Sequence, residues 1–246
     1  MGKNKLKRFN DMAGFANVIQ EPQYAPDTPF ELRGKWGCSR FANSNPIALE
    51  LGCGRGEYTV GLAKRCPDMN FIGIDIKGAR MWKGAKEALT LNLPNACFLR
   101  TRIEMLPRFF APAEVSQIWL TFPDPQMKDT RKRLTSVSFL ERYRTILAPD
   151  GPVCLKTDSN FMYRYTLAVI HENSLPIVAA IENIDETDAP DEVTTVRTNY
   201  ENHWRTLGIA IRYLAFTIPH DRTPLKEPCL EIEKDPYRSR DGVWEG

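Results

Sequence analysis

Short apolar runs alternate with segments of helical spacing between residues 46 and 218. The apolar runs are six to ten residues long, and we expect them to form strands at Pro46–Gly52, Met69–Ile76, Ala96–Thr101, Val115–Phe122, Pro152–Thr157, Ile177–Ile184 and Ile209–Ile218. The intervening spacing predicts helices at Glu57–Cys66, Ala79–Leu91, Glu104–Phe110, Val137–Leu147, Phe161–Asn173 and Tyr200–Thr206. This alternation favours an α/β fold with a single doubly wound, mostly parallel sheet of seven strands and helices on both faces.

The chain divides into three parts. Residues 1–45 are rich in Pro and Gly and show no clear periodicity, so we expect an N-terminal extension laid over or beside the domain. Residues 46–220 contain all the expected strands and form the domain, and residues 221–246 form a C-terminal tail. No internal repeat, low-complexity segment or linker splits the chain.

Composition narrows the class of protein. Of 246 residues, 42% are hydrophobic and 26% are charged, which is ordinary for a globular protein and excludes disordered and fibrous classes. No apolar run approaches the roughly 18 residues that span a bilayer, and the basic N-terminus leads into no apolar signal segment. The closest of the six cysteines, Cys53 and Cys66, are 13 positions apart, which excludes C-x-x-C pairs. We therefore expect buried thiols, a cytoplasmic protein, no membrane and no metal.

The net charge of +2 argues, taken globally, against a nucleic-acid partner. Locally the charge is uneven: residues 126–144 carry six basic and two acidic side chains, whereas residues 182–201 carry seven acidic and one basic. The segment Lys3–Arg8 adds four cations without an acid. The nearly neutral net charge therefore conceals local clusters of basic residues.

A glycine-rich turn follows the first expected strand. The sequence Gly52-Cys53-Gly54-Arg55-Gly56 lets a ligand approach the backbone closely, and Asp75 comes 21 residues after Gly54, an offset that suits a carboxylate holding a ribose diol. The glycine spacing departs from the dinucleotide pattern, and Glu50 and Glu57 flank the turn, where they would repel a pyrophosphate. S-adenosylmethionine (AdoMet), a cationic ligand without phosphate, fits better than a nicotinamide cofactor, so a dehydrogenase is the weakest alternative.

A second candidate site follows the fourth expected strand. Asp124 stands between Pro123 and Pro125, and each proline restricts its own backbone and that of its predecessor, so the carboxylate is held stiffly. The basic residues Lys128, Arg131, Lys132 and Arg133 come next, and we expect them to meet phosphates in a salt-dependent way. The segment Lys3–Arg8 is a second candidate contact with RNA.

Two further polar groups leave their role open. Asp158 follows the fifth expected strand, and Thr198 opens the run Thr198-Asn199-Tyr200-Glu201. Asp and Thr cap helix starts as readily as they bind ligands, so both roles fit. Tyr200 and Trp204 lie four positions apart on an expected helix, where they pack in the core or stack on a base.

At this point the chain resembles the bacterial tRNA (guanine-N7-)-methyltransferases. The resemblance runs from about residue 46 to residue 218 and rests on L-E-L-G-C-G-R-G (49–56), F-I-G-I-D (71–75), F-P-D-P (122–125) before a basic loop, K-T-D (156–158) and T-N-Y-E (198–201). The order and spacing of these motifs are more specific than a general AdoMet-binding fold. The resemblance implies a sheet of the class I methyltransferase type with its last strand antiparallel. It also implies methyl transfer from AdoMet to N7 of a guanine in the tRNA variable loop.

The resemblance also implies roles for individual residues. It assigns Asp124 as the catalytic acid at the edge of the cofactor site, and it places the cofactor at Glu50, Gly52, Gly54, Asp75, Arg102 and Asp124. It places the substrate at Lys128, Asp158, Thr198, Asn199, Tyr200 and Glu201. The sequence departs from the family in two places. In the first, Gln126-Met127 replace the Trp-Pro of the family, and the basic stretch that follows is about two residues shorter and lacks the histidine that the family has there. Arg102 stands where the family often has an Asp near the adenine.

Other functions remain open on the sequence. The fold also serves methyltransferases that act on another RNA, on a small molecule or on a protein, and in the last two cases the basic loop is only a solvated face. The shortened loop and Arg102 also suit a tRNA-binding protein with reduced catalysis. The oligomeric state, monomer or homodimer, leaves no mark on the sequence.

Overall fold

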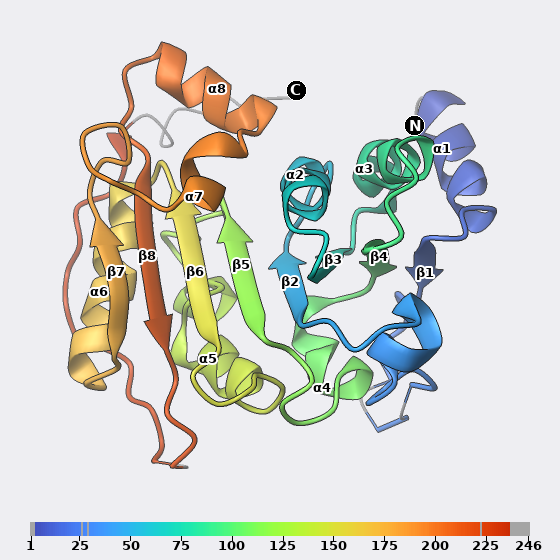
Figure 1. Ribbon diagram of the computed structural model, residues 1–246. Coiled ribbons are helices and arrows are strands. Elements are labelled where there is room, and N and C mark those ends of the chain that lie inside the picture. Colours follow the sequence, from blue (N-terminus) through green and yellow to red (C-terminus); the bar gives the residue numbers. More distant parts are fainter. Residues whose placement is uncertain (1–2, 26, 29, 222, 237–246) are drawn as a thin grey trace. The chain divides into compact units, whose positions relative to one another are not determined.

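The computed structural model describes residues 3–25, 27–28, 30–221 and 223–236 (Figure 1). It divides the chain into two compact units. Unit 1 comprises the residues up to Thr121 together with Thr145–Gly151, and unit 2 comprises Phe122–Arg144 and the residues from Pro152 onward. Parts of the predicted extension and tail, residues 1–2 and 237–246, lie outside the described residues.

Unit 1 is built on a parallel sheet of β1 (Val18–Gln20), β2 (Ile47–Leu51), β3 (Asn70–Asp75), β4 (Ala96–Arg100) and β5 (Gln117–Thr121). The strand order is β1-β4-β3-β2-β5. The chain therefore runs outward from β2 to β4 and then returns to pair β5 with the other edge of β2. This reversal is the switch point of a doubly wound sheet, where ligands bind beyond the carboxyl ends of the strands.

The helices of unit 1 cover strands that are apolar along nearly their whole length. They are α1 (Lys3–Ala13), the π-helix η1 (Trp36–Phe41), α2 (Glu57–Arg65), α3 (Gly78–Thr90), the 3₁₀ turn η2 (Ile103–Met105) and α4 (Leu106–Phe109). All five residues of β2 are buried, as expected for a parallel strand covered on both faces. Helix α3 packs through small residues, because a Cβ on Gly84 would stand 2.6 Å from the carbonyl oxygen of Arg55.

The N-terminal segment is more ordered than its sequence indicates. Helix α1 packs beside α3, and β1 pairs in parallel with β4, which adds an eighth strand to the seven expected (Figure 1). Trp36 is fully buried, donates from its indole nitrogen to the carbonyl of Phe109 at 2.9 Å and stacks on Phe110. Strand β1 was missed because three residues are too few to show a period.

Unit 2 contains β6 (Pro152–Thr157), β7 (Ile177–Ile181) and β8 (Arg212–Thr217) in the order β6-β8-β7. Strand β8 is antiparallel to both neighbours, which confirms the antiparallel last strand. The helices are the 3₁₀ turn η3 (Thr130–Lys132), α5 (Val137–Arg144), α6 (Asn160–Glu172), α7 (Asp191–Thr195) and α8 (Asn199–Thr206). Helix α6 packs on β6 and β8 (Figure 1).

The C-terminal tail runs along α5 and α6. Glu227 accepts the backbone N–H of Val137 at 2.9 Å and the Tyr165 hydroxyl at 2.6 Å, which caps the first turn of α5. Farther along, Asp235 is buried and accepts the backbone N–H of Phe161 at 3.1 Å, at the start of α6. The tail thus supplies the acceptors that two helix N-termini require.

The expected α/β class and all seven expected strands are confirmed, and each predicted helix is present at similar bounds. No disulfide links the six cysteines, all of which lie in the described part of the chain. Three of them are buried as expected, whereas Cys38 and Cys229 are exposed and Cys66 is half-buried. Within the described ranges, no helix has the length and apolar character needed to cross a membrane.

Candidate functional site

The turn between β2 and α2 is shaped by three glycines in the left-handed region. Gly52, Gly54 and Gly56 have φ values of 75°, 55° and 70°, which other residues rarely adopt. A Cβ on Gly56 would stand 2.5 Å from the Phe98 ring, so this glycine lets the turn pack on β4. A Cβ on Gly54 would meet nothing closer than 3.9 Å, so the space above the middle of the turn is open to a ligand.

Asp75, the last residue of β3, holds the same turn. Its carboxylate accepts the backbone N–H of Gly54 at 3.0 Å and that of Lys77 at 2.7 Å, one on each oxygen. Both bonds fix the carboxylate while leaving each oxygen a second lone pair for a ligand. Asp75 is half-buried at the carboxyl edge of the sheet, so this geometry suits the ribose diol that the sequence assigned to it.

Glu50, the penultimate residue of β2, is buried rather than open to the ligand side. Its side chain is 4% exposed, and its carboxylate accepts the backbone N–H of Thr59 at 2.8 Å, the Thr59 hydroxyl, and the Thr121 hydroxyl at 2.6 Å. Burial raises the pKa of Glu50 to about 7, against the opposing effect of these hydrogen bonds. The carboxylate thereby ties the ends of β2 and β5 to the first turn of α2. Its predicted contact with the cofactor stays a prediction.

Thr59 and Thr121 were missed from the sequence, because a threonine carries no pattern that marks it as the partner of a buried acid. Arg102 follows β4 at the same edge and is exposed, at the N-cap of η2. The carboxyl ends of β2, β3 and β4 therefore bring the glycine turn, Asp75 and Arg102 to one edge of unit 1. The carboxylates Glu50 and Asp75 near an open turn fit a cationic ligand such as AdoMet better than a pyrophosphate.

In unit 2, the F-P-D-P loop restricts the backbone of Asp124 and leaves its side chain exposed to solvent. Pro123 and Pro125 are buried, whereas Asp124 is exposed and accepts the backbone N–H of Gln126 at 3.0 Å. Phe122 and Gln126 have φ values of 51° and 45°, a conformation that is uncommon outside glycine and clusters at functional sites. The prediction of a stiffly aimed acid is consistent with this loop.

The four basic residues after this loop divide into two kinds. Lys128, Arg131 and Lys132 are exposed, and Asp129 pairs with Lys132 at 3.2 Å. Arg133 is 7% exposed: its guanidinium donates to the carbonyls of Gln126 and Met127 at 3.2 and 3.3 Å. It also lies over the rings of Phe161 and Tyr165, 4.8 and 4.5 Å from their centroids. Its contact with RNA stays a prediction, whereas its contacts with the loop are observed.

Asp158 directly follows β6 and is fully buried, and its backbone carbonyl accepts from Arg212 at 3.2 Å. The cap of α6 is Ser159, one residue later, which accepts the backbone N–H of Met162 at 2.9 Å and donates to Asp235. The capping role that the sequence left open for Asp158 therefore belongs to its neighbour.

The T-N-Y-E run begins helix α8. Thr198 is its N-cap and accepts the backbone N–H of Glu201 at 3.0 Å, so the capping role is confirmed for this residue. Asn199 is exposed and Tyr200 half-buried. The Tyr200 ring lies 5.5 Å from that of Phe122 and 5.6 Å from that of Trp204, a packed aromatic group beside the F-P-D-P loop.

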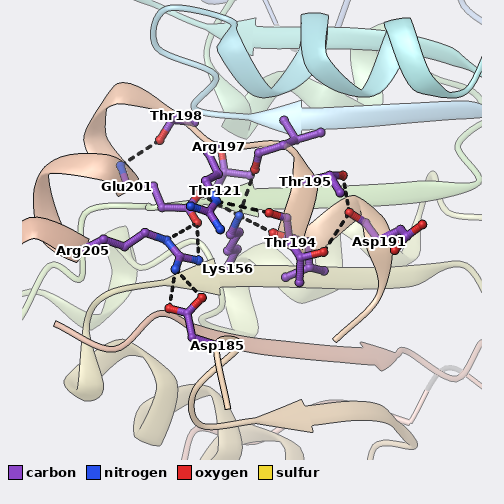
Figure 2. A network of polar contacts seen from close by, with 12 residues as sticks. Thr121, Lys156, Asp185, Asp191, Thr194, Thr195, Arg197, Thr198, Glu201 and Arg205 are labelled. Atoms are coloured by element: carbon purple, nitrogen blue, oxygen red, sulfur yellow. Dashed lines mark hydrogen bonds and ion pairs between the residues drawn. The ribbon is translucent and has the colours of Figure 1, made fainter. Parts of the chain in front are cut away.

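Glu201 turns inward to Lys156 on β6 (Figure 2). Both side chains are fully buried, and the ammonium nitrogen lies 2.7 Å from the carboxylate. Burial lowers the pKa of Lys156 to about 8, against the opposing effect of Glu201. Lys156 was missed as a site residue because its place in the K-T-D motif gives no sign of a partner 45 positions away.

Among the described residues, no group of three His, Cys, Asp or Glu side chains is arranged to hold a metal ion. The switch-point sheet with its glycine turn and Asp75, and the F-P-D-P loop with its exposed acid, define an AdoMet-dependent methyltransferase of class I fold.

Comparison with known proteins narrows this class. The family described as putative methyltransferase matches residues 44–214. The chain is 53% identical over 240 residues to a tRNA (guanine-N(7)-)-methyltransferase of Bacteroides thetaiotaomicron, covering 97% of this chain and 95% of the relative. It is 49% identical to the enzyme of the same name from Porphyromonas gingivalis, covering 93% and 95%. The chain belongs to the tRNA (guanine-N(7)-)-methyltransferase family.

A solved structure supports the fold. The 16S rRNA (adenine(1408)-N(1))-methyltransferase from Catenulisporales acidiphilia is similar with a TM-score of 0.55, over 80% of this chain and 97% of that one. At 12% identity the likeness extends to the fold alone.

Replacing Glu50 with Gln is expected to flatten the pH dependence of the unfolding free energy between pH 4.5 and about 7. In this window the folded protein keeps a proton that the unfolded chain has lost. The wild-type protein therefore loses stability relative to the variant as pH rises, by up to roughly 3 kcal/mol. Urea unfolding followed by circular dichroism at a series of pH values measures the difference. Glu31→Gln, which removes an exposed carboxylate, is the matched control, and parallel curves for wild type and Glu50→Gln would contradict the prediction.

Proposed function

We propose that this protein transfers a methyl group from AdoMet to N7 of a guanine in the variable loop of tRNA. The observation that carries the proposal is the exposed carboxylate of Asp124, held on a proline-locked loop beside the exposed cations Lys128, Arg131 and Lys132. Such a reaction needs an acidic side chain that recognises the guanine. It also needs basic side chains that bind the phosphate backbone of the RNA. The membership of the family supports the same substrate.

Guanine N7 carries an in-plane lone pair and no proton, so the reaction requires alignment more than a base. AdoMet, when bound, would supply the electrophilic methyl group that N7 receives. Proximity and alignment contribute about 7–11 kcal/mol of barrier reduction in such reactions. The guanine becomes cationic as the bond forms, and Asp124 stabilises that charge. Its carboxylate also accepts hydrogen bonds from the N1–H and N2–H₂ edge, which selects guanine over adenine.

The residues of unit 1 bind the cofactor in this proposal. Asp75 accepts from the ribose hydroxyls with the lone pairs that Gly54 and Lys77 leave open. Glu50 keeps the turn in place and contributes negative charge near the cationic cofactor. Arg102, exposed at the N-cap of η2, would be the side chain on the adenine side.

Unit 2 binds the tRNA. Lys128, Arg131 and Lys132 meet phosphates, and Asn199 and Tyr200 line the substrate side, whereas Asp158 is fully buried behind it. Because the substrate is tRNA, we place the activity in the cytoplasm.

Mapping of 7-methylguanosine tests the function. Unmodified tRNA is incubated with AdoMet and the protein, and borohydride reduction followed by aniline cleaves the chain at 7-methylguanosine. We expect a single scission in the variable loop and no methylation of free guanosine. Methylation of a small molecule or protein in place of tRNA would reject the proposal. AdoMet and tRNA binding by calorimetry without scission would instead identify a binding protein.

The Asp124→Asn variant is expected to lose a factor of roughly 10²–10³ in single-turnover methyl transfer, since it removes the charge that stabilises the cationic guanine. AdoMet affinity is expected to persist. Rapid-quench transfer of tritiated methyl groups and calorimetry measure the two quantities. An equal loss of both would assign Asp124 a structural role.

Replacing Lys128, Arg131 and Lys132 together with Gln is expected to lower the slope of log affinity against log salt by about 2 to 3, since each phosphate contact contributes roughly 0.7–0.9. Filter binding of tRNA from low to moderate salt gives the slope. Arg164→Gln is the control: it removes an exposed cation of α6 that lies outside the basic stretch, and it is expected to keep the slope. An unchanged slope in the triple variant would remove these three cations from the interface.

A further inference from the structure

The four substrate residues predicted from the T-N-Y-E run, Glu201 among them, lie on one segment, α7 and α8, between β7 and β8. The position of Thr198, Asn199 and Tyr200 therefore depends on what holds this segment to the sheet of unit 2. Within the described residues, a group of buried charges does so, and Figure 2 shows it at the end of β6.

Lys156 is the centre of this group. Its ammonium donates to the carbonyl of Val193 and, at 3.0 Å, to the carbonyl of Val196, both in or directly after α7. The Glu201 carboxylate on α8 forms an ion pair with the same ammonium at 2.7 Å. Two backbone carbonyls and one carboxylate, all from the segment between β7 and β8, thus surround the Lys156 charge.

Glu201 is equally committed. Its second oxygen accepts from Arg205 at 2.9 Å, and Arg205 continues to Asp185 in the loop after β7 (Figure 2). The Glu201 side chain has no exposed surface, so it offers no face to a base or phosphate in this arrangement.

The backbone of Lys156 holds the acid loop as well. Its carbonyl accepts the backbone N–H of Phe122 at 2.8 Å, and its ammonium lies 5.9 Å from the Phe122 ring. Phe122 opens the loop of Asp124 and its ring packs on Tyr200. One residue therefore joins the loop of the catalytic acid to the helix of the substrate residues.

Stability alone does not explain this pair. A buried ion pair costs desolvation that its attraction often fails to recover, and apolar residues of similar volume hold two elements at least as well. An apolar pair, however, is compatible with several side-chain arrangements, whereas a buried ammonium has to keep its two carbonyl acceptors and its carboxylate in place.

We propose that Lys156 and Glu201 are positioning residues for the guanine site. They fix α7 and α8 against the loop of Asp124, and Glu201 acts on the substrate through Lys156 without touching it. This inference rests on the proposed function and adds the reason why an acid that the T-N-Y-E motif contains is buried.

A double-mutant cycle on the full chain tests this. The variants are Lys156→Met, Glu201→Gln and the two combined, and tRNA KM, kcat and AdoMet affinity are measured for each. We expect each single change to raise tRNA KM about tenfold or more with AdoMet affinity unchanged. The combined variant should be no worse than the poorer single variant, since the second change removes a partner already lost. Multiplying effects would show that Glu201 contacts the substrate on its own and would overturn the proposal.

The exposed pair of Arg164 and Glu182, 3.2 Å apart in the same unit, is the matched control. Arg164→Met combined with Glu182→Gln removes the same charges from the surface and is expected to leave tRNA KM unchanged. An equal rise in tRNA KM in this control variant would mean that the effect of the Lys156 variant comes from the general change of charge and not from positioning.

Hydrogen exchange separates this inference from the proposed function, because it needs no tRNA. In Glu201→Gln, and in Lys156→Met where it folds, amides of residues 191–206 should exchange faster while those of β2 and β3 keep their protection. If the protein does not methylate tRNA but these amides exchange faster, Lys156 and Glu201 do hold α7 and α8 in place, and it is the proposed function, with its guanine, that falls. Unchanged exchange of this segment in Glu201→Gln would overturn the positioning role.

Discussion

An ionisable side chain buried near the end of a strand needs hydrogen-bond or ion-pair partners, and neighbouring helices and strands have to supply them. This requirement constrains the structure of both units. Glu50 is the penultimate residue of β2, and Lys156 is the penultimate residue of β6. Each is deeply buried, and each collects its partners from the segments that follow: Glu50 from α2 and β5, Lys156 from α7 and α8. An unpaired charge at either place would cost several kcal/mol, so the elements around it are constrained to one arrangement. The functional residues stand on these same elements.

The strands and most of the helices from residue 46 onward were predictable, because buried parallel strands are continuous apolar runs and the helices between them keep their period. Strand β1, the π-helix at Trp36 and the five-residue helix α7 were not, since short elements held by tertiary contacts have no periodic signal. The site followed the same division. The turn glycines and Asp124 were predictable, because glycines permit positive φ angles and the prolines on either side of Asp124 restrict its backbone. The burial of Glu50, Arg133 and Glu201 depends on partners that are distant in the sequence. A sequence motif identifies such a residue but does not indicate the direction of its side chain.

Arg133 gives a physical reason why the loop after Asp124 tolerates Gln126-Met127 in place of Trp-Pro. The guanidinium binds the carbonyl oxygens of these two positions, and a carbonyl is present whatever the side chain. The rings of Phe161 and Tyr165 hold the guanidinium from the other side. The positive φ of Gln126 is also easier for glutamine than for a β-branched or bulky residue. The loop therefore keeps its course through its backbone, and its side chains are left to vary.

The position of β8 between β6 and β7 sets an order for synthesis on the ribosome. Unit 1 is complete once residue 151 has emerged, because its last piece, Thr145–Gly151, precedes β6. Unit 2 has no such early point: β7 pairs with β8, which is made after it, and the starts of α5 and α6 wait for Glu227 and Asp235 in the tail. During translation, β7 therefore has to remain without its sheet partner until β8 has emerged. A chain cut before Glu227, outside every motif of the family, would leave the starts of α5 and α6 without the carboxylates that accept from them.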